Sequence, residues 1–140
     1  MKSIFNKKIC IVYSTYSDEI NQETLSIVKS ELKKKHLKKI EIIKVPGSFE
    51  IPVTISRLIK KYDAFIAIGT IVKGETNNFE LISNAITNGI MKLSIENKKP
   101  IGNAIITAFN KDQAKKRTIR GQEAVNAIID VLKNETKSIK

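Results

Sequence analysis

Cysteine, histidine and tryptophan are almost absent from this sequence, which holds one cysteine, one histidine and no tryptophan. Cys10 has no partner for an internal disulfide. It lies within the apolar run at residues 9–12, so we predict a buried strand residue rather than a nucleophile. His36 stands among lysines, and this solvated setting argues against a metal-binding or catalytic role. The sequence therefore shows no metal site.

Long hydrophobic runs are missing too. The longest runs, such as residues 64–68, are far too short to span a bilayer, and no signal-type segment is visible at the N-terminus. We therefore expect a soluble protein of the cytoplasm.

The chain has 140 residues, of which 41% are hydrophobic. This is enough to bury one core, so a single domain over residues 1–140 is expected.

Acidic residues are few relative to basic ones, since 25 Lys and Arg against 14 Asp and Glu give a net charge of +11. Clustered cations attract polyphosphate, which invites a nucleic-acid interpretation. The lysines are spread along the chain, mostly at predicted helix ends, where cations favour the helix dipole. The sequence also lacks the interleaved aromatic and basic residues of an RNA-binding sheet. A solvated basic surface is the better interpretation, no nucleic-acid partner is expected, and an anionic small substrate fits equally well.

The hydrophobic period switches repeatedly between strand and helix. Strands are predicted at residues 8–14, 39–45, 63–72 and 100–108, and helices at 20–32, 49–61, 77–98, 111–117 and 122–132. Asn77, with Glu80 three residues later, forms a capping-box-like start for the third helix. Nearly continuous apolar strands that alternate with helices predict a parallel sheet covered on both faces. The expected fold is a three-layer α/β/α sandwich with four strands.

In such sheets, ligands bind outside the carboxyl ends of the strands. The segments to consider are therefore residues 14–18, 46–50, 70–78 and 103–110. The Gly74-Glu75-Thr76 loop enters a predicted helix N-terminus, which favours an anion such as phosphate, although a turn that only caps the helix explains it equally well. Glu50 could hydrogen-bond a polyol or amine, or act only as a helix-dipole partner. Tyr16 could stack on a planar ring, but taken alone an ordinary half-buried tyrosine is the better interpretation.

Taken together, these segments resemble the lumazine synthase family. VPGSFEIP (residues 45–52) and GTIVKGETNNFE (69–80) resemble its two signature stretches, and PIGNAIIT (100–107) and QAKKR (113–117) resemble its last strand and its arginine-bearing helix. The resemblance covers almost the whole chain and implies a four-stranded parallel sheet of flavodoxin-like order. It also implies condensation of 5-amino-6-(D-ribitylamino)uracil with 3,4-dihydroxy-2-butanone 4-phosphate to 6,7-dimethyl-8-ribityllumazine in riboflavin biosynthesis. Phosphate and water are released, without any metal or organic cofactor.

The resemblance further implies roles for individual residues. Tyr16 falls where the family has an aromatic side chain that stacks on the pyrimidine ring. The residues implied to contact the aminouracil are Ser48, Phe49, Glu50, Thr70, Ile71, Val72 and Asn103. Glu75 and Thr76 match the loop that receives the butanone phosphate, and Arg117 matches the residue that pairs with it. Arg120 is a candidate replacement for a phosphate-side lysine.

Two departures from the family pattern alter these expectations. The family's proton-transfer histidine is Asn78 here. Asparagine cannot exchange a proton near neutral pH, so general acid–base catalysis, typically worth roughly 100- to 10,000-fold, would be lost at this position. The connection after Arg117 is shortened to residues 118–121, which makes a pentamer the expected assembly. In such a pentamer, Asn103 would reach the site from the neighbouring subunit.

Three hypotheses from different classes follow. The favoured one is an active lumazine synthase with altered acid–base chemistry. The second is a weakened homologue that binds a lumazine, a flavin or a pathway intermediate without turnover. Retention of Glu50 and Arg117 argues against it, since a ligand without phosphate has little need for the arginine. The third and most distant is a basic nucleic-acid-binding module.

Overall fold

The computed structural model describes residues 4–75 and 78–136. Within these residues the strands are β1 (Ile9–Ser14), β2 (Ile40–Val45), β3 (Ala64–Val72) and β4 (Ile101–Ala108). The α-helices are α1 (Asp18–Lys34), α2 (Ile51–Leu58), α3 (Phe79–Asn97), α4 (Lys111–Lys115) and α5 (Arg120–Thr136), and the short 3₁₀ turns are η1 (Ser48–Glu50) and η2 (Lys73–Glu75). No helix of the described part is long and apolar enough to cross a membrane.

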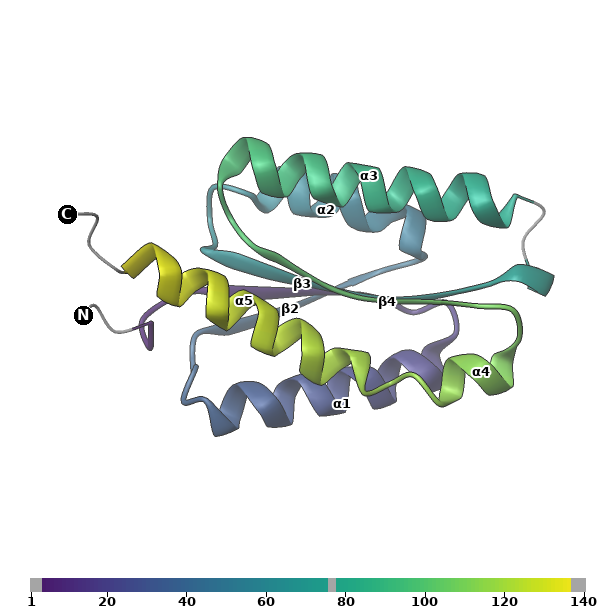
Figure 1. Cartoon of the computed structure of the whole chain (residues 1–140), viewed down its shortest axis with the longest axis horizontal. Coiled ribbons are helices and arrows are strands. Elements are labelled where there is room, and N and C mark those ends of the chain that lie inside the picture. Colours follow the sequence, from purple (N-terminus) through teal and green to yellow (C-terminus); the bar gives the residue numbers. More distant parts are fainter. Residues whose placement is uncertain (1–3, 76–77, 137–140) are drawn as a thin grey trace.

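The strands form one parallel sheet in the order β2-β1-β3-β4. This is the flavodoxin-like order, with crossovers on both faces. Helices α2 and α3 cover one face, and α1, α4 and α5 cover the other (Figure 1). The predicted α/β/α sandwich is confirmed, and β2 and β4 are its edges.

Alternation along the central strands divides the core into two clusters. Ile9, Ile11 and Tyr13 of β1 pack with α1 and α5, whereas Cys10 and Val12 face the layer of α2 and α3. The helical spacing of Phe79, Ile82, Ile86, Ile90 and Leu93 puts them on one face of α3, and all five lie in or against the second cluster. Burial raises the pKa of the Cys10 thiol to about 12, in agreement with an inert strand residue.

Helix boundaries differ from the prediction where packing decides them. The helix predicted over residues 49–61 is the turn η1 followed by α2, with Pro52 in the first turn of α2, where its missing N–H costs no helical hydrogen bond. The α5 helix begins at Arg120, two residues before its predicted start. Gly121 allows this start, because an added Cβ would lie 2.9 Å from the carbonyl oxygen of Thr24 on α1. Asn77 lies outside the described residues, and Asn78 is the N-cap of α3.

Candidate functional site

The loops after β1, β2 and β3 meet at the carboxyl end of the sheet, on the right of Figure 1. The backbone N–H of Thr15 donates to the carbonyl of Val45 at 2.9 Å, and that of Tyr16 donates to Pro46 at 3.2 Å. The turn η1 packs on β3, because a Cβ added to Gly69 would collide with Ser48 Oγ. One chain therefore brings these three predicted segments together.

Aromatic and acidic side chains border this meeting point. Tyr16 and Phe49 are 53% and 64% exposed, so both rings are open to a ligand. Ser48 is buried against β3, whereas Glu50 is half-buried with its carboxylate turned toward Gly47. Glu50 is also the N-cap residue of α2, so its charge interacts favourably with the helix dipole in addition to any contact with a ligand.

The strand β3 extends beyond its neighbour β1. The two strands pair as far as Tyr13 and Ile68, while β3 continues to Val72 beside β4. Thr70, Ile71 and Val72, all predicted site residues, form this extension, and their side chains are buried. What this extension offers beside the end of β1 is therefore backbone that β1 no longer pairs, rather than these side chains.

The glycine-rich loop leads from β3 to the start of α3. Glu75 ends the turn η2, and Thr76 lies outside the described residues. Asn78 is exposed at the N-cap of α3, and its side chain makes no capping hydrogen bond to the helix. Its amide thus stands beside the positive end of a long helix without being used to close it.

The remaining predicted residues lie along the edge strand β4, in the foreground of Figure 1. Arg117 Nη1 donates to the carbonyl of Thr107 at 2.8 Å, and Arg120 Nε makes a long contact of 3.5 Å to the carbonyl of Asn103. Asn103 Oδ1 accepts from the N–H of Ile105 at 3.0 Å. Three side chains thus cover alternate backbone groups of an open edge. Asn103 and Thr107 are roughly 13 Å apart along the strand, so the structure does not bring the two arginines to one point.

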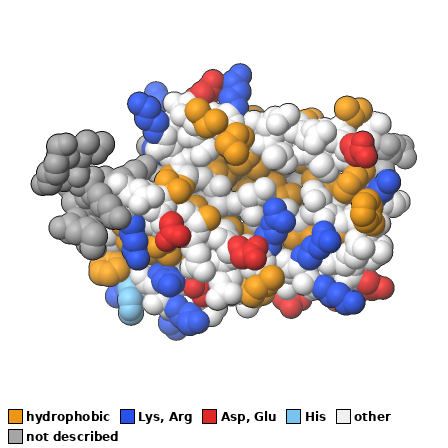
Figure 2. All heavy atoms as spheres, viewed as in Figure 1, with side chains coloured by type: hydrophobic (Ala, Val, Ile, Leu, Met, Phe, Trp, Pro, Cys, Tyr) orange, Lys and Arg blue, Asp and Glu red, His pale blue; other side chains and the backbone are white. Residues whose placement is uncertain are grey.

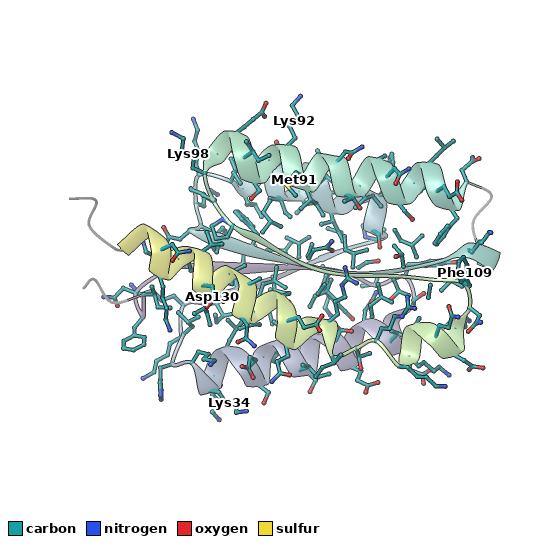
Figure 3. The ribbon with its side chains drawn as sticks, in the orientation of Figure 1. Lys34, Met91, Lys92, Lys98, Phe109 and Asp130 are labelled. Carbon is teal, nitrogen blue, oxygen red and sulfur yellow. The ribbon has the colours of Figure 1, made fainter. Side chains whose placement is uncertain are left out.

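Two features at this end of the sheet involve residues outside the predicted set of site residues. One is a cation–π contact, and the other is a buried asparagine. Lys73 Nζ lies 5.4 Å from the centroid of the Phe109 ring, and this cation–π contact joins the loop after β3 to the loop after β4. Phe109 is labelled at the end of β4 in Figure 3. Asn21 of α1 is completely buried beneath the first loop. The sequence signal that could have found it is an asparagine next to Ile20 in the buried stripe of that helix.

The only histidine cannot replace a proton carrier at Asn78. His36 follows α1, which runs back along the sheet from the carboxyl end of β1. It lies against Phe5, with the ring centroids 6.1 Å apart, at the opposite end of the molecule from the loops.

Tyr13 is not a proton carrier either. Burial and Asp18 raise the pKa of Tyr13 to about 12, so this phenol stays neutral in the physiological range.

Comparison with known proteins gives one consistent result. Residues 6–136 match the family model described as 6,7-dimethyl-8-ribityllumazine synthase. A protein of that name from Buchnera aphidicola subsp. Baizongia pistaciae is 41% identical over 136 residues, covering 90% of this chain and 86% of the relative. Those from Pyrococcus furiosus and Methylibium petroleiphilum are 36% and 34% identical, covering 79% and 91% of this chain and 71% and 82% of the relatives.

Proposed function

Because the chain belongs to the 6,7-dimethyl-8-ribityllumazine synthase family, we propose that it makes 6,7-dimethyl-8-ribityllumazine in riboflavin biosynthesis. The substrates would be 5-amino-6-(D-ribitylamino)uracil and 3,4-dihydroxy-2-butanone 4-phosphate, and the reaction releases phosphate and water. The observation that carries the proposal is the junction of the first three loops. There Tyr16, Ser48 and the β3 extension share one end of the sheet.

The aminouracil would bind at this junction. The exposed ring of Tyr16 offers a face for stacking on the pyrimidine. The main chain of residues 70–72 passes the end of β1, where its donors and acceptors can meet the edge of the heterocycle. Glu50, beside Ser48 and Phe49, would hydrogen-bond the ribityl chain, because a carboxylate accepts from several hydroxyls.

The phosphate would bind between the start of α3 in one copy of the chain and Arg117 of a neighbouring copy. With Nη1 held by Thr107, the guanidinium keeps its other N–H groups for two phosphate oxygens. The loop with Glu75 and Thr76 would supply further groups at the positive end of α3. Arg120 would join only by releasing the carbonyl of Asn103.

In the reaction itself, Asn78 would orient an intermediate or a water molecule by hydrogen bonds. Its amide makes no cap bond to α3 and is available for this task. An amide carries no exchangeable proton near neutral pH, so proton transfer would fall to solvent and to the substrates. Catalysis would then rest chiefly on holding two reactive molecules together.

A homo-oligomer, most simply a pentamer, would complete the site. Asn103 lies exposed on the edge strand β4, and Arg117, exposed after α4, donates to the same strand, which β3 separates from β1. Apolar residues of the layer above are exposed as well, among them Val53, Leu81 and Met91. Figure 2 shows hydrophobic side chains gathered along the seam between that layer and the sheet edge. Such a face suits burial against another copy of the chain, which would place Asn103 beside the neighbour's aminouracil.

The second candidate function is a weakened homologue that binds a lumazine or flavin without turnover. The asparagine at position 78 is the observation that favours it. One assay separates the two candidates: purified protein is mixed with both substrates, and lumazine absorbance is followed against the uncatalysed background. Product formation in proportion to protein concentration supports the synthase. Binding of lumazine with no rate above background supports the binder.

A further inference from the structure

Asn21 is a buried polar residue outside the family's signature stretches. Its side chain is completely buried on the first turn of α1. The amide nitrogen donates to the carbonyls of Ser14 and Tyr16, both at 2.8 Å, and the amide oxygen accepts from Thr70 Oγ1 at 2.7 Å. Such a group constrains its surroundings strongly, because each bond that breaks leaves a polar atom without a partner away from water.

These three bonds lie where the backbone ladder ends. Pairing between β1 and β3 stops at Tyr13 and Ile68, after which β1 enters its turn and β3 runs on. Asn21 holds the β1 side through two carbonyls and the β3 side through Thr70. It therefore fixes the separation of the two segments beyond the last strand pair.

Asn21 also supports the turn that directs Tyr16. The next residue, Ser17, has a φ of 62° and a ψ of 46°, a left-handed conformation that residues with a Cβ rarely adopt. Such a conformation persists only where the surroundings hold it. Asn21 binds on both sides of the strained residue: its backbone N–H donates to Ser17 at 3.1 Å, and its side chain donates to Tyr16.

We propose that Asn21 is a positioning residue for the aminouracil half of the site. It acts through Tyr16 and Thr70, whose relative placement it sets, and it does not touch the substrate. This inference rests on the proposed function. It predicts an effect on one substrate only, because no bond of Asn21 reaches Arg117 or the start of α3.

The kinetic test uses Asn21→Leu, which keeps the approximate volume and removes all three bonds. We expect the KM for the aminouracil to rise roughly tenfold, with the KM for the butanone phosphate within about twofold of wild type. Thr24→Val is the matched control. Thr24 is completely buried on the same helix, and its hydroxyl donates only to Ile20 of that helix, at 3.2 Å. Both KM values should stay at the wild-type level in this control.

Amide hydrogen exchange in the free protein tests the same idea without substrate. Because the N–H groups of Thr15 and Tyr16 donate to Val45 at the end of β2 and to Pro46 after it, they report the position of the turn. Exchange at both should become roughly tenfold faster in Asn21→Leu and stay unchanged in Thr24→Val. If Asn21→Leu fails to fold, Thr70→Val removes only the bond between Thr70 and Asn21. It should then raise both the KM for the aminouracil and the exchange rates at Thr15 and Tyr16.

The outcomes separate this inference from the proposed function. Wild-type protein that forms no lumazine would refute the function, and amide exchange would then decide the role of Asn21. Equal rises in both KM values would mean a general loss of structure. Unchanged exchange at Thr15 and Tyr16 in a folded Asn21→Leu variant would overturn the positioning role.

Discussion

The two halves of the candidate site are built in different ways. At the junction of the first three loops, Ser48 and Thr70 are buried and the main chain is tied across β1, β2 and β3. Along the edge strand β4, Asn103 and Arg117 are exposed and bind chiefly to the backbone of β4. One fold can preorganise the first half alone. The second half is exposed to solvent at the edge of the sheet, and we propose that a neighbouring copy of the chain uses it.

The largest expected effect comes from separating the copies. Met91 is 57% exposed on α3, so Met91→Asp should place a charge in the contact between subunits and leave the core of each chain intact. Light scattering should then give the mass of a single chain, 15.7 kDa, and lumazine formation should be lost. The control is Lys92→Asp, at a neighbouring position that points away from the sheet edge in Figure 3. A folded monomer that remains active would show that one chain holds the whole site.

Loss of Arg117 should affect the edge half alone. Because a charge-assisted contact to phosphate disappears, Arg117→Ala should raise the KM for the butanone phosphate by roughly 100-fold and leave aminouracil binding nearly unchanged. Steady-state kinetics with each substrate varied in turn measure this. Arg57→Ala, which removes an exposed arginine from α2, is the control and should change neither constant. Equal losses for both substrates would mean that Arg117 is misassigned.

A histidine at position 78 would test whether proton transfer at the loop after β3 limits the reaction. Asn78→His should raise kcat on the order of tenfold and introduce a pH dependence near the titration of imidazole, where the wild type should be flatter. A pH–rate profile of both proteins gives the result. Asn84→His adds the same group at another exposed position of α3 and should change nothing. An unchanged rate for Asn78→His would mean that proton transfer at this position does not limit the reaction.

The smallest effect is expected in the packing of the buried half. Gly69→Ala should lower the free energy of unfolding by about 1–3 kcal/mol, because the added methyl group meets Ser48 Oγ. Gly74→Ala is the matched control, since an added Cβ at Gly74 meets no atom within 4 Å. Denaturant titrations compare the two variants. Equal stability of both would show that η1 moves freely over β3.

Sequence patterns predicted the fold because its determinants are local. The stripe of α3 and the apolar strands, with Cys10 among their buried residues, follow from periodicities of a few residues. The strand order was implied only by the family resemblance. The boundary of α5 could not be predicted, since it depends on Gly121 meeting a helix almost a hundred residues earlier in the chain.

The candidate site, like the fold, could be predicted from the sequence only in part. The resemblance named the residues, and their roles stay predictions. The sequence could not show that Arg120 contacts the carbonyl of Asn103 rather than lying beside Arg117, or that Asn21 joins two strands. These contacts join residues that only the completed sheet brings together.

Mixing two inactive variants tests most directly whether each site is divided between chains. Tyr16→Ala should disable the loop junction, and Arg117→Ala should disable the edge half. At low substrate concentration each protein alone should form little lumazine. If the site lies between copies, co-assembly in equal amounts should restore roughly a quarter of the wild-type sites, because each half is intact in half of the chains. Activity that never exceeds the sum of the separate variants, in oligomers shown to contain both chains, would contradict the divided site.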